Sequence, residues 1–251
     1  MRITVETCVA RHVGDRKEQQ DRVAIFSHPT KPGTLLAVLA DGMGGHTGGA
    51  MAAEQVLLTA RQNFESFAPE SDTPERLLES TVVDAHAAIR LCRFTSEQDP
   101  HSTIVVFMLY QGRSYWAHCG DSRLYHFRGR ETLLRSQDHS LVGELQRRGR
   151  LTEEETLVHP QRNVLIACLG GDRRPLVEHG NRDDLVAGDS FLLCSDGLWA
   201  YFSDEEASSI LTEYSAREAA GILIDLARER ACGHGDNISL AIVKFVPVPE
   251  S

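Results

Sequence analysis

The amino-acid sequence predicts an α+β fold, because its strand and helix signals are grouped along the chain rather than strictly alternating. Residues 2–10 alternate like a half-buried strand, and Thr34–Ala40 is a continuous apolar run typical of a buried strand. Apolar residues then recur at helical spacing. Between residues 102 and 134, short apolar segments separated by glycines predict an antiparallel meander.

Local signals bound several of these elements. Thr73-Pro74 combines a capping residue with proline at the first helical position, so a helix is expected from there to about Arg93. The strands expected after it are residues 102–110, 114–119, 123–128, 131–134, 191–195 and 238–245. Capping boxes that start helices are expected at Thr152, Ser203 and Ser215.

Composition limits the classes of function. The 251 residues suit one domain, and 41% hydrophobic and 25% charged residues are ordinary globular values. The net charge of −10, with only three lysines, argues against a nucleic-acid surface. No apolar run approaches the length of a membrane span, and the N-terminal residues lack a signal-peptide pattern. We therefore expect a cytoplasmic monomer that binds neither membranes nor nucleic acids.

The six cysteines give no zinc or redox motif, because no two are spaced as Cys-x-x-Cys. Cys168 and Arg174 do match the Cys-x5-Arg spacing of cysteine-dependent phosphatases. Pro175 follows directly, which disfavours the loop-into-helix anion cradle that this chemistry uses. We expect reduced, mostly buried thiols.

Four aspartates share one local pattern: each lies beside a strand end and next to glycine or another small residue. Asp-Gly and Gly-Asp are common turn dipeptides, so each position alone is better explained as a turn. Carboxylates at the ends of separate strands can, however, converge on one point, and hard divalent cations prefer several oxygen ligands. The four together favour a metal centre. They are Asp41, Asp121, Asp196 and Asp236.

An ordered set of motifs resembles the metal-dependent, type 2C serine/threonine protein phosphatases, and most of all their bacterial branch. The resemblance covers roughly residues 5–245. It is carried by Arg16-Lys-Glu-Gln-Gln-Asp21, Asp41-Gly-Met-Gly-Gly-His46, Ser102-Thr103, Gly120-Asp-Ser-Arg123, Asp138-His-Ser140, Ser195-Asp-Gly197 and Gly235-Asp-Asn237. It implies a single domain over residues 1–251, built as a four-layer αββα sandwich of two antiparallel sheets flanked by helices. Residues 138–174 correspond to the flap segment that lies beside the site in this family.

The resemblance also implies a set of metal ligands. Asp41 would bridge two Mn²⁺ or Mg²⁺ ions, with the carbonyl of Gly42 on one of them. Asp196 and Asp236 would bind the other ion, and Asp121 would hold a third, weaker ion together with Asp196.

Further roles follow from the N-terminal and C-terminal motifs. Arg16 would clamp the substrate phosphate through its planar guanidinium. Asp21 would contribute near the metals through a bound water, Asn237 would orient Asp236, and Gln20 would lie beside the metals without the charge of the glutamate found in many relatives.

The sequence does not assign the general acid, the residue that donates a proton to the leaving group. Met43 stands where eukaryotic members carry a histidine proposed as general acid. His46 is the nearest candidate, although a histidine after a glycine turn is more often structural. His101 replaces the usual glycine before Ser102, a departure that the sequence does not explain.

The implied reaction is hydrolysis of phosphoserine and phosphothreonine in proteins by a two-ion, or three-ion, centre that activates water. The implied partners are phosphorylated proteins and a cognate Ser/Thr kinase pathway. The alternative is an inactive pseudophosphatase that binds phosphoproteins or acts as a scaffold. Retention of all four aspartates favours the enzyme.

Overall fold

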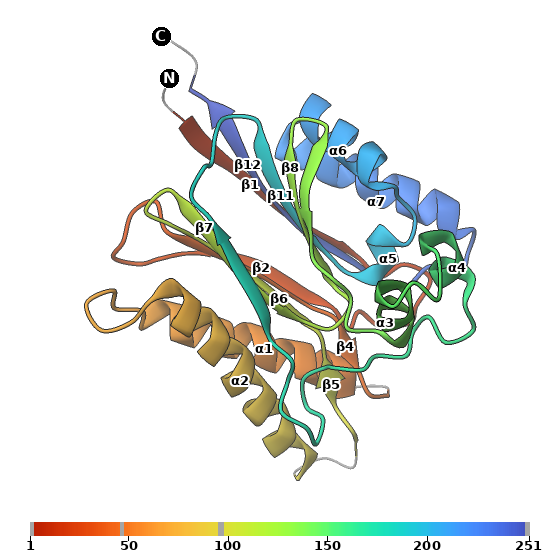
Figure 1. Cartoon of the computed structure of the whole chain (residues 1–251). Coiled ribbons are helices and arrows are strands. Elements are labelled where there is room, and N and C mark those ends of the chain that lie inside the picture. Colours follow the sequence, from red (N-terminus) through yellow and green to blue (C-terminus); the bar gives the residue numbers. More distant parts are fainter. Residues whose placement is uncertain (1–2, 46–47, 95–97, 249–251) are drawn as a thin grey trace.

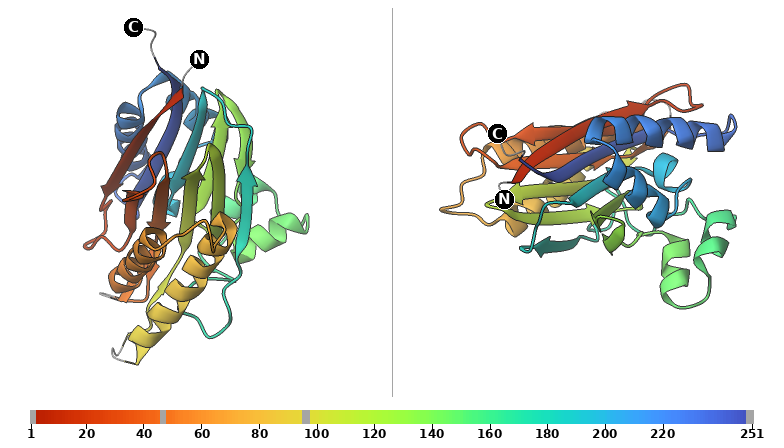
Figure 2. Two further views of the ribbon diagram at one scale, coloured as in Figure 1. Left: turned by 90° about the vertical axis from the view of Figure 1, so that its left-hand side faces the viewer. Right: turned by 90° about the horizontal axis from the view of Figure 1, so that it is seen from above.

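The structure is a computed structural model that describes residues 3–45, 48–94 and 98–248. Two five-stranded antiparallel sheets pack face to face, and helices cover both outer faces (Figures 1 and 2). This arrangement confirms the predicted α+β sandwich. Within the described ranges, no helix is long and apolar enough to cross a bilayer.

The strands of each sheet come from distant parts of the chain. The first sheet has the order β1-β12-β11-β8-β9, formed by Ile3–His12, Ile238–Pro247, Asp189–Cys194, Arg123–Arg128 and Glu131–Arg135. The second has the order β10-β7-β6-β3-β2, formed by Glu178–Arg182, Arg113–Cys119, Ile104–Tyr110, Leu35–Ala40 and Arg22–Ser27. A short pair, β4 (Gly42–Met43) and β5 (His101–Ser102), lies beside the second sheet.

Seven helices are described, in three groups (Figure 1). Two long helices cover the second sheet: α1 (Gly48–Glu65) and α2 (Pro74–Arg93). Three cover the first sheet: α5 (Asp196–Trp199), α6 (Asp204–Glu213) and α7 (Ala216–Ala231). Two belong to the flap segment: α3 (Leu141–Arg147) and α4 (Glu153–Val158).

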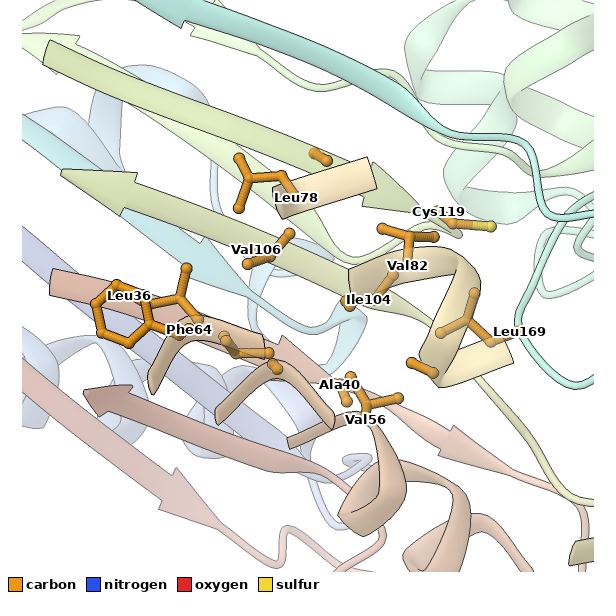
Figure 3. Close-up of a cluster of buried hydrophobic side chains, with 14 of the residues drawn as sticks. Leu36, Ala40, Val56, Phe64, Leu78, Val82, Ile104, Val106, Cys119 and Leu169 are labelled. Atoms are coloured by element: carbon orange, nitrogen blue, oxygen red, sulfur yellow. The ribbon is translucent and has the colours of Figure 1, made fainter. Parts of the chain in front are cut away.

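The central strands are apolar throughout because both of their faces are buried. In β3, Leu36 and Val38 face the cluster shared with α1 and α2, whereas Ala37 and Leu39 face the cluster between the sheets. The same alternation places buried residues on both sides of β6, β11 and β12. Figure 3 shows the first of these clusters, where Phe64 and Val56 of α1 meet Leu36 and Ala40. These layers fix where each strand ends, and the strand ends build the site.

The expected elements are largely present, with physical reasons for the differences. The strand predicted over residues 102–110 is broken at Thr103, whose backbone N–H donates to Asp41 O at 2.9 Å instead of joining the sheet. The edge strands β2 and β10 were not predicted; every residue of both is half-buried or exposed, and β10 contains no apolar side chain. Asp196 follows the predicted strand but lies in the first turn of α5.

The predicted caps are largely present. Thr152 with Glu155, and Ser215 with Glu218, form complete capping boxes. Ser203 accepts from the N–H of Glu206 at 3.2 Å, but the Glu206 carboxylate forms an ion pair with Arg230.

Candidate active site

The predicted aspartates meet at one end of the sandwich. Asp41 follows β3, Asp196 follows β11, Asp236 precedes β12, and Asp21 precedes β2. Antiparallel pairing of Arg22 with Ala40 brings the ends of β2 and β3 together. Carboxylates that are far apart in sequence therefore lie at the same end of the sandwich, where these strands begin or end.

Asp41 lies electrostatically at the centre of this group. Burial, followed by the charges of Asp21, Asp196, Asp121 and Asp236, raises the pKa of Asp41 well above its usual range. Burial and the charge of Asp236 raise the pKa of Asp196 to about 6. Such mutual destabilisation of negative charge is the condition that a bound cation relieves.

Asp21 is buried between the two sheets' ends. Ser195 Oγ donates to its Oδ2 at 2.9 Å and accepts from the N–H of Ser239 at 3.0 Å. Burial, and then the charge of Asp196, raise the pKa of Asp21 to about 7, even though the Ser195 hydrogen bond opposes the shift. The prediction that Asp21 belongs to the site fits this position.

The Ser102-Thr103 motif holds the backbone of Asp41. Thr103 Oγ1 accepts from Asp41 N–H at 3.0 Å, and Ser102 Oγ donates to Asp41 O at 3.0 Å. The motif is therefore a clamp on Asp41. His101, unexplained by the sequence, pairs across β4 and β5 with Met43, and its Nδ1 lies 2.9 Å from Asp99 O.

Only glycine fits at position 42. A Cβ there would lie 2.0 Å from Gly49 O and 2.7 Å from Gln20 O, both fixed backbone atoms. Gln20 lies beside this turn, and its Nε2 donates to Gly45 O at 3.0 Å. The predicted candidate His46 lies outside the described residues.

Arg16 reaches the aspartate group from the loop after β1. Its Nη2 donates to Asp236 Oδ2 at 2.6 Å, and both side chains are well exposed. Asn237 was expected to orient Asp236, and its backbone N–H donates to Asp236 Oδ1 at 2.8 Å. Its side chain does something else: Nδ2 donates to Val13 O and Glu18 O, and Oδ1 accepts from the N–H of Gln20. Asn237 thus anchors the whole loop that carries Arg16.

Gly14 is a further site residue that the sequence analysis missed. Its φ is +64°, and a Cβ there would lie 1.9 Å from Asp236 O. A glycine between two expected elements indicates a turn, but only the folded structure shows that it packs against a site residue.

Asp121 lies after β7 and is nearly buried. Trp199 Nε1 donates to its backbone O at 2.9 Å. The Arg123 guanidinium stacks 3.6 Å from the Trp199 ring centroid and forms two 2.8 Å hydrogen bonds with Asp138. Burial, and then the charge of Asp196, raise the pKa of Asp121 well above its usual range.

A cavity of about 220 Å³ joins the aspartates to the flap segment. Its lining includes Arg16, Asp121, Asp196, Asp236, Trp199 and, from the flap segment, Arg162. Arg147 and Arg148 do not line this cavity and pair instead with Glu144 of α3.

Comparison with known proteins identifies the family of this chain. The sequence matches the family model described as Protein phosphatase 2C over residues 10–223. The chain belongs to the protein phosphatase 2C family. It is 34% identical to a protein phosphatase 2C-type protein of Streptococcus pyogenes over 97% of both chains. It is 30% identical to the serine/threonine phosphatase stp of Listeria monocytogenes over 91% of both chains.

Solved type 2C structures share the fold. A serine/threonine phosphatase of S. agalactiae superposes with a TM-score of 0.86 at 29% identity, covering 97% of this chain and 100% of that one. The catalytic domain of PstP, in complex with 2 manganese ions, superposes with a TM-score of 0.81 at 26% identity, covering 98% of this chain and 100% of that one.

The donor set of this type 2C phosphatase fits hard divalent cations. Its converging side chains are carboxylates, which suit Mn²⁺ and Mg²⁺. Two ions at such a centre lie roughly 3.5–4 Å apart, so their ligands need not meet at one point. Among the described residues, the three ligand atoms that do lie within 4.8 Å of one another belong to a different group: His118, His139 and Glu178.

Cysteine chemistry is disfavoured by the environment of Cys168. Burial raises the pKa of its thiol, whereas a nucleophilic cysteine needs a lowered pKa. Arg174 lies 80% exposed, 3.7 Å from Glu79 on α2. The sequence match to Cys-x5-Arg is therefore not an anion-binding loop.

Proposed function

We propose that the protein hydrolyses phosphoserine and phosphothreonine in other proteins, using a two-ion Mn²⁺ or Mg²⁺ centre. The observation that carries this proposal is the group of aspartates around Asp41, whose pKa is raised by burial and by the charges of Asp21, Asp196, Asp121 and Asp236. Asp121, Asp196 and Asp236 line a cavity that Arg16 also lines. Negative charge concentrated at such a cost is characteristic of functional sites.

The ligand assignment is the one that the family resemblance implies. Asp41 would bridge the two ions, and its position is consistent with this role because burial and the charges of four other aspartates raise its pKa. The Gly42 carbonyl would bind one ion, and Asp196 and Asp236 would bind the other. Asp121, whose pKa is raised by burial and by the charge of Asp196, would hold a third ion together with Asp196. Bound divalent ions at such a centre activate water and offset phosphate charge.

The residues around the ions bind and orient the substrate. The Arg16 guanidinium offers a planar pair of donors to two phosphate oxygens. Its ion pair with Asp236 is exposed and therefore weak, so the exchange of Asp236 for a phosphate dianion costs little. Loop 13–20 stays in place during this exchange because Asn237 holds its backbone.

The cellular setting is part of the same proposal. Relatives are named serine/threonine phosphatases, so phosphorylated proteins are the expected partners, together with a Ser/Thr kinase that acts on the same substrates. We further propose that the protein acts as a cytoplasmic monomer, with residues 1–251 as a single domain whose flap segment borders the cavity.

Metal dependence and substitution of ligands test the function. Chelation should abolish hydrolysis of a phosphothreonine peptide, and added Mn²⁺ should restore it. Asp196→Asn and Asp236→Asn should each lower turnover by orders of magnitude with an unchanged fold by circular dichroism. Cys168→Ser is the matched control and should keep wild-type activity.

Two results would contradict the proposal. A Cys168→Ser variant with normal metal content and no activity would point to cysteine chemistry. A wild-type protein that binds Mn²⁺ and phosphopeptide but releases no phosphate would establish the pseudophosphatase.

A further inference from the structure

The group formed by His118, His139 and Glu178 lies outside the aspartate cluster but reaches it through one glycine. His118 lies near the C-terminal end of β7, and Glu178 of β10 pairs with it across the sheet. His139 lies at the start of the flap segment. Both histidines are buried, and their rings stack at 4.7 Å with an interplanar angle of 21°.

His139 grips Gly120 from both sides. The Gly120 N–H donates to His139 Nδ1 at 3.2 Å, and the His139 N–H donates to Gly120 O at 2.9 Å. Thr103 packs closely against Gly120 as well, because a Cβ on Gly120 would lie 2.6 Å from Thr103 Cγ2. Gly120 is thus enclosed between His139 and the residue that clamps Asp41.

The hydrogen bonds define the tautomer of His139. Since Nδ1 accepts from Gly120, the ring proton lies on Nε2. Nε2 lies 3.2 Å from Glu178 Oε1 without the geometry of a hydrogen bond, so the carboxylate favours a proton on Nε2 through its charge. His118 packs on the ring but makes a different contact, with its Nε2 2.9 Å from Gln137 O.

The same contacts disfavour a metal ion in this group. A histidine that ligates through Nε2 normally donates its Nδ1–H to an acceptor, whereas Nδ1 of His139 faces the N–H of Gly120. The His118 Nε2 faces a carbonyl oxygen and carries a proton for the same reason. Nearly parallel stacked rings also point their lone pairs side by side rather than at a common ion.

We propose that His139, with its tautomer set by the Gly120 N–H and favoured by the charge of Glu178, is a positioning residue that holds Gly120 and thereby places the Asp121 carboxylate for its metal ion. Asp121 is the next residue, and its own carbonyl is fixed by Trp199. The peptide group before the Asp121 Cα is held by the backbone N–H of His139, and the one after it by the Trp199 side chain. The His139 ring fixes the peptide group one step earlier, through the N–H of Gly120. This inference rests on the proposed function, because it takes Asp121 to be a metal ligand.

Substitutions at the two histidines separate positioning from packing. His139→Phe keeps an aromatic ring in the stack but removes the acceptor for Gly120, whereas His139→Asn keeps an acceptor near the place of Nδ1. We expect His139→Phe to weaken the weakest Mn²⁺ site about 10-fold to 100-fold, the usual effect of losing a residue that orients a ligand. His139→Asn should restore much of that affinity. His118→Phe is the matched control and should change it little.

A double-mutant cycle gives the sharpest test. Isothermal calorimetry with Mn²⁺ and no substrate measures each site in wild type, Asp121→Asn, His139→Phe and the double variant. If His139 acts through Asp121, the double variant should bind Mn²⁺ like Asp121→Asn alone. Additive losses, or an equal loss at the sites of Asp196 and Asp236, would show a general structural role and overturn the proposal.

Histidine ¹⁵N NMR supplies a readout that needs neither metal nor activity. The expected spectrum shows His139 protonated at Nε2 and unprotonated at Nδ1, and Glu178→Ala should increase exchange at the Gly120 amide. The opposite tautomer would overturn the proposal. So would stoichiometric metal that is retained in Asp121→Asn and lost in His118→Phe, which would mean a separate metal site. A protein without phosphatase activity would refute the proposed function while leaving this cycle measurable.

Discussion

Proton release should accompany metal binding, because the pKa values of two proposed metal ligands, Asp21 and Asp196, are raised in the metal-free protein. The pKa is raised to about 7 for Asp21 and to about 6 for Asp196. Ligands must lose their protons before they bind, so lowering the pH from 7 to 5 should weaken Mn²⁺ binding.

The size of the effect follows from these two values. Lowering the pH from 7 to 5 reduces the deprotonated fraction about 50-fold for a group with a pKa of about 7. The reduction is about 10-fold for a group with a pKa of about 6. The dissociation constant should therefore rise by roughly 500-fold if both groups bind as carboxylates. Asp41, whose pKa is raised further, can only add to this change.

Calorimetry can measure both the affinity and the protons. Metal-free protein is titrated with Mn²⁺ at pH 5, 6 and 7 in two buffers of different ionisation enthalpy. Asp21→Asn should make the pH dependence shallower by up to about 50-fold over the same range. Asp172→Asn, a change at an exposed carboxylate paired with Arg93, should leave it unaltered. A dissociation constant that is independent of pH, with no proton release, would refute the reasoning.

The same shift has a signed consequence for the metal-free fold. Because the folded pKa of Asp21 is raised from 3.8 to about 7, the folded chain holds a proton that the unfolded chain has lost. Its contribution to stability is complete below about pH 4 and is lost as the pH rises toward 7. Buried histidines with lowered pKa make the stability change with pH in the opposite direction. The contribution of Asp21 is therefore isolated by comparing the thermal unfolding of wild type and Asp21→Asn over this pH range.

Three further predictions test the site. Arg16→Ala should raise KM and weaken phosphate inhibition about 10-fold to 100-fold, as expected for charge-assisted hydrogen bonds of about 1.5–3 kcal/mol, and unchanged phosphate inhibition would place the clamp elsewhere. Gln20→Glu should lower the Mn²⁺ concentration for half-maximal activity by adding a hard anionic ligand, although it loses the donor to Gly45 O; an unchanged or higher value would mean that position 20 does not face the metals. Gly14→Ala and Gly33→Ala should each lower the free energy of unfolding by about 1–2 kcal/mol, because both positions have a left-handed backbone. Only Gly14→Ala should also weaken Mn²⁺ binding, because only its Cβ would meet Asp236 O. Equal Mn²⁺ affinity in the two variants would contradict this.

Sequence patterns predicted the layers of this fold because they record burial directly. Strands such as β3 and β11 are buried on both faces, so they are continuous apolar runs, and the aspartates that follow them mark where the sheets end. For β2 the alternation of Val23 and Ile25 was an available signal, since both pack against the cluster between the sheets. β10 offered less, because Glu-His-Gly-Asn-Arg contains no apolar side chain of the usual strand type.

The remaining features depend on contacts that no local pattern encodes. Thr103 breaks its strand because Asp41 competes for its backbone and hydroxyl groups. Asn237 was predicted to orient its neighbour, yet its side chain holds a loop more than 200 positions earlier. His139 belongs to a recognised motif, but its grip on Gly120 depends on how the flap segment returns to β7.

The site closes some of the longest loops in the chain. Arg16 and Asp236 are 220 positions apart, and the N–H of Gln20 meets Asn237 across 217. The ladder from Ile3 with Pro247 to His12 with Ile238 brings these segments together, at a high cost in chain entropy. No contiguous fragment can therefore assemble the catalytic group, and partial unfolding that detaches β12 should abolish turnover before most of the sandwich is lost. Enzyme activity would then serve as a sensitive reporter of whether the first and last strands are paired.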